Sequence, residues 1–164
     1  MPVEVFVEAC RKDARLPVYA KQGDSGMDVY SAEDVLINPS ETVIVPSGIK
    51  LALPEGYEIQ VRPRSGISFN TPLRLSNSPG TIDSGYRDEL GILITNTSLK
   101  EEKNYEILNL ESKGNKNGIY KINKGDRIAQ IVLQKVPVMK LTLVDNVKKI
   151  GNDRGGGIGS TGVY

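Results

Sequence analysis

Apolar residues alternate with polar residues along most of this chain, and this period of two constrains the fold more than any other feature of the sequence. Near the start, Val3, Val5 and Val7 show the pattern. Successive side chains of a β-strand point to opposite faces, so this spacing predicts half-buried strands and disfavours helices. Comparable apolar or β-favouring segments lie at 42–45, 49–53, 57–61, 90–95, 119–122 and 128–138. We therefore expect an all-β protein.

Turn-forming residues separate these segments at short intervals. Asn38-Pro39-Ser40 precedes one strand, and Pro54-Glu55-Gly56 divides two others. The chain has 17 glycines and 9 prolines among 164 residues, which exceeds the usual share and agrees with a fold of many turns. Short strands between such turns are typical of an antiparallel barrel or sandwich, and this length corresponds to one domain. One stretch, 62–75, has room for one or two helical turns.

Two segments differ from the strand pattern. Residues 98–118 are polar and charged, and we expect a surface insertion or long hairpin there, most simply a solvated loop. Residues 145–164 end in RGGGIGSTGVY, where five glycines between Gly155 and Gly162 are incompatible with a core element. We expect residues 1–144 to form the β-domain and residues 145–164 to form a flexible C-terminal arm.

The composition excludes several kinds of chemistry. The chain has no histidine, which removes histidine general bases, Ser-His-Asp triads and histidine-ligated metals, and its single Cys10 cannot form an intrachain disulfide. A formal net charge of +1 gives no global attraction to nucleic acid, so we expect no direct nucleic-acid binding. No apolar run approaches the roughly 18 residues of a membrane span, and the first residues do not resemble a leader. We expect a cytoplasmic protein without membrane contact, in a cell or, for a virus, in its host.

Five short polar clusters remain once the strands are set aside. They are DSGMD at 24–28, PRSG at 63–66, NSPGTIDSGYR at 77–87, KGDRIAQ at 124–130 and RGGGIGSTG at 154–162. Each cluster alone has a simple structural explanation, because Asp, Ser, Gly and Pro are common in tight turns. The five together are more informative, because their chemistry is complementary.

The clusters fit a nucleoside polyphosphate. Arg64, Arg127 and Arg154 carry permanently charged guanidinium groups that suit phosphate oxygens. Glycines beside serine hydroxyls can present backbone N–H groups to an anion. Asp83 and Tyr86 add one carboxylate and one aromatic ring within a single turn-rich segment. These residue types predict contacts with phosphates, a sugar and a base.

In order and spacing, the five clusters resemble the five motifs of the homotrimeric dUTPases, the deoxyuridine 5′-triphosphate nucleotidohydrolases. The match covers most of the chain, and NSPGTIDSGYRDE together with PRSGIS is its most specific part. The resemblance implies a jelly-roll-like antiparallel β-barrel assembled as a homotrimer, with arm exchange and three active sites between subunits. It also implies hydrolysis of dUTP to dUMP and diphosphate, which limits uracil incorporation into DNA and supplies dUMP for thymidylate synthesis.

The resemblance assigns chemical roles to two acids. Asp83 matches the general base that activates the water attacking the α-phosphorus. Asp28 matches an acid that approaches a magnesium ion through water, and Mg²⁺ is the implied cofactor, held mainly by substrate phosphates. Mg²⁺ keeps most of its waters in such sites, so the lack of a cluster of ligands in the sequence is no objection.

The resemblance also assigns the contacts to dUTP. Asn77, Gly91 and the backbone at 80–82 match the group that reads uracil, and Tyr86 matches the ring that stacks under deoxyribose. Other matched residues bind phosphate, partly from a second subunit. The implied substrate-binding residues in the body of the chain are Arg64, Ser65, Gly66, Asn77, Gly80, Thr81, Ile82, Tyr86, Gly91 and Gln130.

The last motif departs from the family pattern. The resemblance implies that the arm closes over a nucleotide bound by a neighbouring subunit, with Arg154, Ile158, Gly159 and Ser160 at the substrate. The family usually has one more residue in this motif, and a phenylalanine that stacks on uracil where this chain has Ile158. An isoleucine covers the base by apolar contact but has no π face.

Two other functions remain open from the sequence. A dCTP deaminase-related enzyme is one, although the segment around Asp83 and the terminal arm favour a dUTPase. A non-hydrolysing, nucleotide-binding regulatory protein is the other, which the altered last motif suggests and which the intact Asp83, Ser65 and Gln130 oppose. Gly85 and Asp88 replace an acidic residue and a glycine that are commoner in the family, and the sequence does not explain Asp88.

Overall fold

The computed structural model describes residues 2–100, 105–157 and 160, and nearly all of its regular structure is β-strand. The strands are β1 (Phe6–Ala9), β2 (Val18–Tyr19), β3 (Met27–Tyr30), β4 (Val35–Ile37), β5 (Thr42–Pro46), β6 (Ile49–Ala52), β7 (Tyr57–Arg62), β8 (Leu73–Leu75), β9 (Gly80–Ile82), β10 (Gly91–Asn96), β11 (Ile107–Asn109), β12 (Ile119–Ile122) and β13 (Arg127–Lys135). A short helix, α1 (Ser65–Asn70), follows β7, and a 3-10 turn, η1 (Val147–Lys149), lies near the end of the chain. The all-β prediction is confirmed, and α1 lies within the stretch that has room for helical turns.

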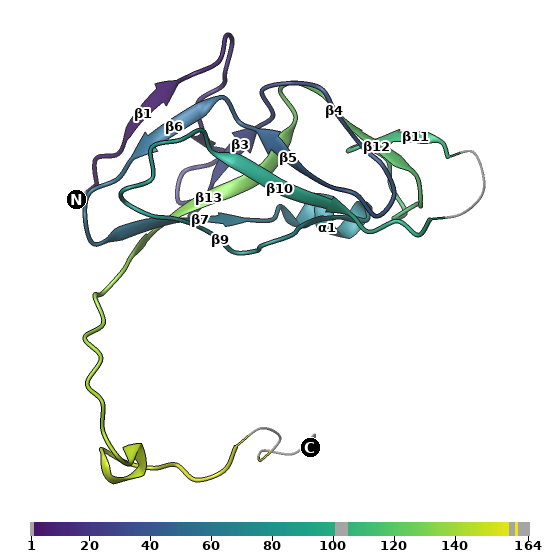
Figure 1. The fold of residues 1–164 in the computed structure, drawn as a ribbon. Helices are drawn as coiled ribbons and strands as arrows, with labels where there is room; N and C mark the ends of the chain where they lie inside the picture. Colours follow the sequence, from purple (N-terminus) through teal and green to yellow (C-terminus); the bar gives the residue numbers. More distant parts are fainter. Residues whose placement is uncertain (1, 101–104, 158–159, 161–164) are drawn as a thin grey trace.

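The strands form four sheets (Figure 1). The largest has the order β2-β3-β13-β7-β9, two others are β5-β10-β8 and β11-β12-β4, and β1 pairs with β6. Among the described residues, every pair is antiparallel except β11 with β12, which run parallel. The longest strand, β13, lies between β3 and β7. It therefore brings together segments that are far apart in the sequence.

The predicted antiparallel sheets are confirmed, but the described strands form no closed barrel. In the part of the chain that the structure describes, the four sheets do not join into a continuous barrel. The outer strands of the largest sheet, β2 and β9, each pair on one side only, so the ladder of hydrogen bonds ends at them. These strands have only two and three residues, which leaves little edge on which a further strand could pair.

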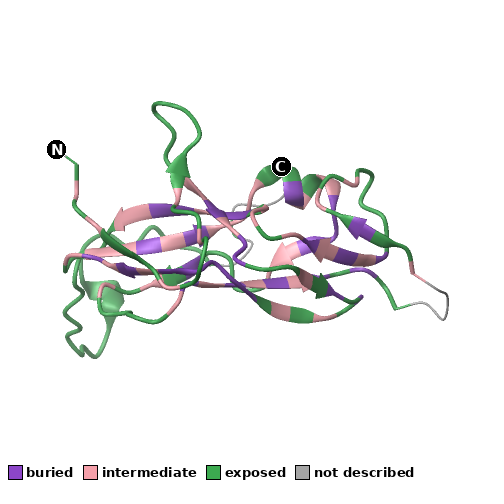
Figure 2. Cartoon of the chain, turned by 90° about the horizontal axis from the view of Figure 1, so that it is seen from above, coloured by how far each residue is buried: buried purple, intermediate pink, exposed green. Residues whose placement is uncertain are grey.

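A continuous apolar core lies inside the domain (Figure 2). In β10 alternation places one face inward: Ile92 and Ile94 are buried, whereas Leu93 between them is partly exposed. Tyr120 of β12 is the largest fully buried side chain, and its hydroxyl donates to the Lys116 carbonyl at 3.0 Å. Burial raises the pKa of the Tyr120 phenol, because a phenolate would be poorly solvated there.

The two ends of the 98–118 segment are held together by buried polar groups. The Asn96 amide donates to the carbonyls of Gly118 at 2.8 Å and Ile37 at 2.9 Å, and the Gly118 N–H donates to the Ser98 hydroxyl at 3.2 Å. Between these ends, β11 pairs with β12 and Leu108 is buried in the core. The segment is therefore anchored to the domain, and the parallel direction of β11 and β12 excludes a hairpin between these two strands.

The chain leaves the sheets after β13, as Figure 1 shows. Every described residue from Lys135 onward is exposed, and η1 is the only regular structure described beyond β13. Pro137 has no N–H for a strand ladder, which explains why β13 ends before the predicted limit at 138. The described helical segments are too short to cross a membrane.

Candidate functional site

A polar cavity of about 390 Å³ lies beside β3, β7, β13 and the start of α1. Three of the five sequence clusters, at 24–28, 63–66 and 124–130, contribute to its walls. The residues predicted for the site that line it are Asp28, Arg64, Ser65, Gly66 and Gln130. Folding thus brings these five together, although up to about 100 residues separate them along the chain.

The register of the central sheet explains part of this assembly. Gln130 of β13 lies opposite Asp28 of β3 on one side and opposite Arg62 of β7 on the other. Directly opposed residues of neighbouring strands point to the same face of a sheet. One row across three strands therefore presents a carboxylate, an amide and a guanidinium group to the cavity.

Asp28 lies between two arginines. Its Oδ1 accepts a hydrogen bond from Arg64 Nε at 2.9 Å, and its Oδ2 accepts one from Arg127 Nη1 at 3.2 Å. The Asp28 side chain is only 12% exposed, whereas Arg64 and Arg127 are 27% and 51% exposed. The carboxylate offsets the repulsion between two neighbouring cations. Each guanidinium group has five N–H donors, so both arginines keep donors for a further anion.

Gln130 connects the central strand to the segment before α1. Its Nε2 donates to the Pro63 carbonyl at 2.8 Å. A Cβ atom on Gly26 would lie 2.5 Å from Gln130 Oε1, so the glycine leaves the space that this amide occupies. Ser65 and Gly66 follow at the start of α1, where both are exposed. Hydroxyl, amide and guanidinium donors thus face one cavity.

The cluster at 77–87 forms a separate segment around β9. Gly80, Thr81 and Ile82 make up this outer strand, which pairs with β7. A Cβ atom on Gly80 would lie 3.3 Å from Asn77 Nδ2, which places the exposed Asn77 amide beside the backbone of β9. An outer strand has backbone N–H and C=O groups on its unpaired edge. An amide and such an edge together suit recognition of a flat polar ring.

Asp83 and Tyr86 lie just after β9. Asp83 is exposed, and its carboxylate has no hydrogen-bond or ion-pair partner among the described residues. The Tyr86 N–H donates to the Asp83 carbonyl at 3.1 Å, and the Tyr86 hydroxyl donates to the Glu89 carbonyl at 3.0 Å. The segment therefore presents a carboxylate without a partner next to an aromatic residue that is held at both ends.

Gly91 is placed differently from the other predicted uracil contacts. It begins β10 opposite Pro46 of β5, and β10 belongs to a different sheet from β9. The predicted residues of the arm lie elsewhere again. Arg154 and Ser160 are exposed on the segment beyond β13, and Ile158 and Gly159 lie outside the described residues.

Within one chain the two groups of predicted site residues do not share a cavity. Ile82 lies opposite Ile59, three residues before Arg62 at the end of β7. At about 3.3 Å per residue, this places the end of β9 roughly 10 Å from the polar cavity along the strands, with Asp83 farther away. Among the described residues, the cavities that contain Arg64 include neither Asp83 nor Tyr86.

Sequence reasoning missed several residues of the site. It described the Arg127 guanidinium group as suited to phosphate oxygens but did not include Arg127 among the substrate-binding residues. It overlooked Arg62, whose place opposite Gln130 follows only from strand pairing. Outside the polar cavity, it assigned no role to Arg11 or Glu89, whose side chains pair at 2.7 Å although 78 residues separate them. The hydrogen bond to Glu89 raises the pKa of the Arg11 guanidinium group. The Glu89 carboxyl group follows the 77–87 cluster closely, which is the one signal that could have identified it.

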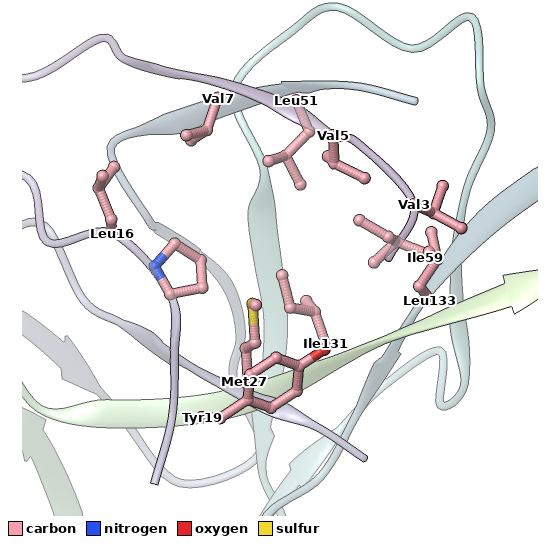
Figure 3. Close-up of a pocket in the computed structure, with 11 residues that line it drawn as sticks. Val3, Val5, Val7, Leu16, Tyr19, Met27, Leu51, Ile59, Ile131 and Leu133 are labelled. Carbon is pink, nitrogen blue, oxygen red and sulfur yellow. The ribbon is translucent and has the colours of Figure 1, made fainter. Parts of the chain in front are cut away.

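A second cavity, of about 270 Å³, is mainly apolar (Figure 3). Its walls come from the N-terminal segment and from β3, β6, β7 and β13, and include Val3, Val5, Met27, Leu51, Ile59 and Leu133. It lies beside β1 and β2, each of which pairs on one side only among the described strands. We refer to it as the apolar groove.

Comparison with known proteins identifies relatives along nearly the whole chain. The family model of dUTPase matches residues 12–102, which is more than half of the chain. The deoxyuridine 5′-triphosphate nucleotidohydrolase of Hydrogenobaculum sp. (strain Y04AAS1) is 42% identical over 164 residues, covering 98% of this chain and 99% of that protein.

Solved structures agree with the sequence comparison. The dUTPase of Staphylococcus bacteriophage 80alpha with dUPNHPP superposes with a TM-score of 0.87 at 31% identity, covering 98% of this chain and 99% of that one. A mutant dUTPase from phage phi11 of S. aureus, in which a structural Mg(II) ion is coordinated, superposes with a TM-score of 0.79 at 29% identity, covering 87% and 97%.

Proposed function

The chain belongs to the dUTPase family, and on that premise we propose that it hydrolyses dUTP to dUMP and diphosphate at a site shared between copies of the chain. The polar cavity carries the proposal, because Asp28, Arg64, Ser65 and Gln130 meet there from three separate sequence clusters. The relatives compared above are dUTPases, so neither a dCTP deaminase-related enzyme nor a non-hydrolysing regulatory protein is favoured.

The polar cavity binds the phosphates in this proposal. Arg64 and Arg127 supply fixed positive charge, and Gln130, Ser65 and the backbone at Gly66 supply neutral donors. Asp28 holds the two arginines in place before a nucleotide arrives, through the contacts at 2.9 and 3.2 Å. Phosphoryl transfer asks a protein mainly for positioning and charge stabilisation, and groups fixed in advance provide both.

Asp83 acts as the general base. Its carboxylate is exposed and has no partner among the described residues, so it is free to accept a proton from the water that attacks the α-phosphorus. Tyr86 packs against deoxyribose, where its ring leaves no room for a 2′-hydroxyl. Asn77 and the backbone of β9, with Gly91, read uracil. The O–P bond to the diphosphate group breaks as the water oxygen bonds to phosphorus.

A complete site then requires a second copy of the chain. The group around Asp83 and the polar cavity lie too far apart along β7 and β9 to hold one reacting phosphorus within a single chain. A neighbour that presents its Arg64 cavity to the Asp83 segment of the first copy completes the site, and cyclic repetition of this contact gives a homotrimer with three sites.

The apolar groove is where a neighbouring arm docks. Residues just beyond β13 expose their apolar side chains almost fully, with Val138 95%, Leu141 89% and Leu143 99% exposed. The groove offers matching apolar walls (Figure 3). The edges of β1 and β2 that pair with no described strand offer backbone partners. An extended segment that adds to a strand edge gains hydrogen bonds along its backbone and apolar contacts from alternate side chains.

The end of the arm closes a site in this arrangement. Its 20 residues from Asp145 to Tyr164 span at most about 66–72 Å when extended, which is enough to cross one small subunit. Arg154 and Ser160 supply phosphate contacts, and Ile158 and Gly159 cover the base. Closure over the nucleotide excludes water other than the attacking molecule.

The residues of the polar cavity fit a magnesium ion that arrives with the nucleotide. The described residues contain no group of three or more carboxylate or thiolate side chains that could hold a metal. Both Asp28 oxygens already accept from arginines, so Asp28 would approach the ion through water. Such an ion would neutralise phosphate charge when bound.

Release of diphosphate from dUTP, dCTP, dTTP and UTP, with and without magnesium, tests the proposed function. We expect the chain to cleave dUTP selectively and magnesium to raise the rate. Deamination of dCTP would support the related deaminase, and binding of dUTP without release of diphosphate would support a regulatory protein.

Light scattering tests the assembly. We expect a particle of three times the chain mass of 17.9 kDa. Replacing Leu141 and Leu143 by lysine should dissociate it or release the arm, whereas Leu36→Lys should not, because Leu36 is also exposed but lies on β4 outside the groove. A monomer for the parent chain would contradict a shared site.

A further inference from the structure

The loop between β9 and β10 contains both Asp83 and Tyr86 and is exposed along most of its length. Within the loop, the Tyr86 N–H donates to the Asp83 carbonyl at 3.1 Å, and Arg87 Nη1 donates to the carbonyls of Ser84 at 2.6 Å and Tyr86 at 2.9 Å. The Tyr86 hydroxyl donates to the Glu89 carbonyl at 3.0 Å. The hydroxyl therefore fixes the far end of the Tyr86 ring to the backbone of Glu89. The position of the Tyr86 ring therefore depends on the position of Glu89.

Glu89 is held by two segments outside the loop. Its Oε1 accepts from the Gly48 N–H at 2.8 Å and from Arg11 Nε at 2.7 Å, and its Oε2 lies 2.9 Å from the same Arg11 nitrogen. The Glu89 side chain is 25% exposed, so these contacts are partly shielded from water. They join the end of the loop to the turn before β6 and to the N-terminal segment.

The residue after Glu89 strengthens this attachment. Leu90 is 1% exposed, its N–H donates to the Ile49 carbonyl at 2.9 Å, and its carbonyl accepts from the Ser47 N–H at 3.2 Å. The core therefore fixes the backbone after Glu89. The contacts of the Glu89 carboxylate set the direction in which the loop before Glu89 runs. Arg11 is itself held from the other side by Glu33, at 3.0 Å.

We propose that Glu89 and Arg11 are positioning residues that set the place of the Tyr86 ring, and through it the selection of deoxyribose over ribose. The inference rests on the proposed function, in which Tyr86 packs against the sugar. Loss of the Glu89–Arg11 contact frees the Glu89 side chain, while Leu90 still holds the peptide group that carries the Glu89 carbonyl. The backbone from Tyr86 to Glu89 then shifts relative to this fixed acceptor, the Tyr86 ring tilts, and space for a 2′-hydroxyl opens. The same movement shifts Asp83 through its carbonyl contact to the Tyr86 N–H.

Comparison of dUTP with UTP separates this role from a contribution to stability. A single ion pair that is partly exposed to water contributes little to folding, so its removal should change the melting temperature only slightly. A site that rejects an extra hydroxyl sterically, however, is sensitive to small displacements of the ring. The readout is therefore the ratio of kcat/KM for dUTP to kcat/KM for UTP.

The test uses Glu89→Gln and Arg11→Met in the full-length chain. Glu89→Gln keeps an acceptor for Gly48 and loses the charge that binds Arg11, whereas Arg11→Met removes the guanidinium group from the other side. We expect both to lower the dUTP/UTP ratio by about 3- to 10-fold, a range consistent with loss of one partly shielded ion pair. Arg11→Lys should lie between Arg11→Met and the parent, because it keeps the charge without the fork.

Glu33→Gln is the matched control, because it removes the other partner of Arg11 without touching the loop, and its ratio should equal that of the parent. Tyr86→Phe tests the connection. If Glu89 acts through the Tyr86 hydroxyl, the two substitutions are not independent. The dUTP/UTP ratio of the double variant Tyr86→Phe with Glu89→Gln should then fall by less than the product of the fold-decreases in the two single variants.

The outcomes distinguish the two proposals. A parent chain that releases no diphosphate from dUTP overturns the proposed function. An active parent whose Arg11→Met and Glu89→Gln variants keep the parental ratio overturns only the positioning role. If Glu89→Gln fails to fold, Arg11→Met decides the question alone, because Arg11 is an exposed residue outside the core.

Discussion

The polar cavity contains Asp28 and the loop after β9 contains Asp83, but of these two acids only Asp28 has ion-pair partners among the described residues. In the cavity, Asp28 is 12% exposed and pairs with both Arg64 and Arg127. In the loop, the Asp83 carboxylate is exposed and has no partner among the described residues. In the polar cavity, the charge of the carboxylate is paired within the chain. In the loop, the carboxylate of Asp83 faces solvent. In the proposed function, one chain organises phosphate binding in advance and presents its general base to a nucleotide that is also held by another copy.

The physical reason lies in the cost of placing like charges together. Two arginines that share a cavity repel one another, and the carboxylate between them offsets this repulsion. A single exposed carboxylate needs no such partner, because water solvates it. A partner would also hinder it as a base, since a paired carboxylate accepts protons less readily.

The largest expected effect comes from the loop. Asp83→Asn keeps the shape of the side chain and removes the proton acceptor, so we expect turnover of dUTP to fall roughly 10²- to 10⁴-fold while binding of dUPNHPP is kept. Single-turnover diphosphate release and calorimetry measure the two quantities. Asp88→Asn is the control, because Asp88 is an exposed acid of the same loop. Equal turnover in Asp83→Asn and the parent would remove Asp83 from the mechanism.

Removal of residues 151–164 should have the next largest effect. We expect turnover to fall by roughly 10-fold or more, because the site can no longer close and reactants are less well oriented. The particle mass from light scattering should not change, since the apolar residues beyond β13 remain. Unchanged kinetics would show that the shortened last motif has no part in the reaction, and dissociation would assign it to assembly instead.

A smaller effect, on stability, should come from the polar cavity. Asp28→Asn removes the charge and replaces one of the two acceptor oxygens by an NH₂ donor, so one of the two arginines loses its partner and we expect the free energy of unfolding to fall by about 1–2 kcal/mol. Urea denaturation measures it. Asp83→Asn should leave stability unchanged, because it breaks no contact among the described residues. Equal stability losses in the two variants would contradict the contrast between the regions.

The smallest effect lies in a third region, beneath the 98–118 segment. Burial raises the pKa of Tyr120, so the unfolded chain loses this proton at lower pH than the folded chain does. The phenol is neutral in both states below about pH 10, and stability should fall as pH rises through that value. Tyr120→Phe should reduce this loss between pH 9 and 11, as seen in the melting temperature. If the melting temperature falls equally with pH in the parent and in Tyr120→Phe, the loss of stability comes from other titrating groups.

The strands that the sequence predicted are those long enough to show a period. Segments 42–45, 57–61 and 119–122 correspond closely to β5, β7 and β12. The strands β2, β4, β8, β9 and β11 have two or three residues each, and so few residues cannot show alternation. The 98–118 segment was expected mainly as a solvated loop because its composition is polar. Leu108 is buried in the core, and Ser98 and Gly118 make buried contacts at the two ends of the segment, none of which composition indicates.

The sequence predicted which residue types belong to the candidate site, but it did not predict which of them lie together in space. The motifs identified Arg64, Ser65, Gly66 and Gln130, which line one cavity with Asp28. Their grouping follows from the register of β3, β13 and β7, which pairs residues far apart in the sequence. The role of Arg11 in holding Glu89 was not predictable, because a contact over 78 residues leaves no local pattern.

The sequence by itself determined the all-β class, the lack of histidine chemistry and the set of groups available to a nucleoside triphosphate, because these follow from residue types and local spacing. The tertiary structure alone decided which of these groups meet. Strand pairing placed Asp28 between two arginines and left Asp83 without a partner on the outer side of the largest sheet. Pairing depends on contacts between distant segments, and each short strand is compatible with many partners until the whole core is packed.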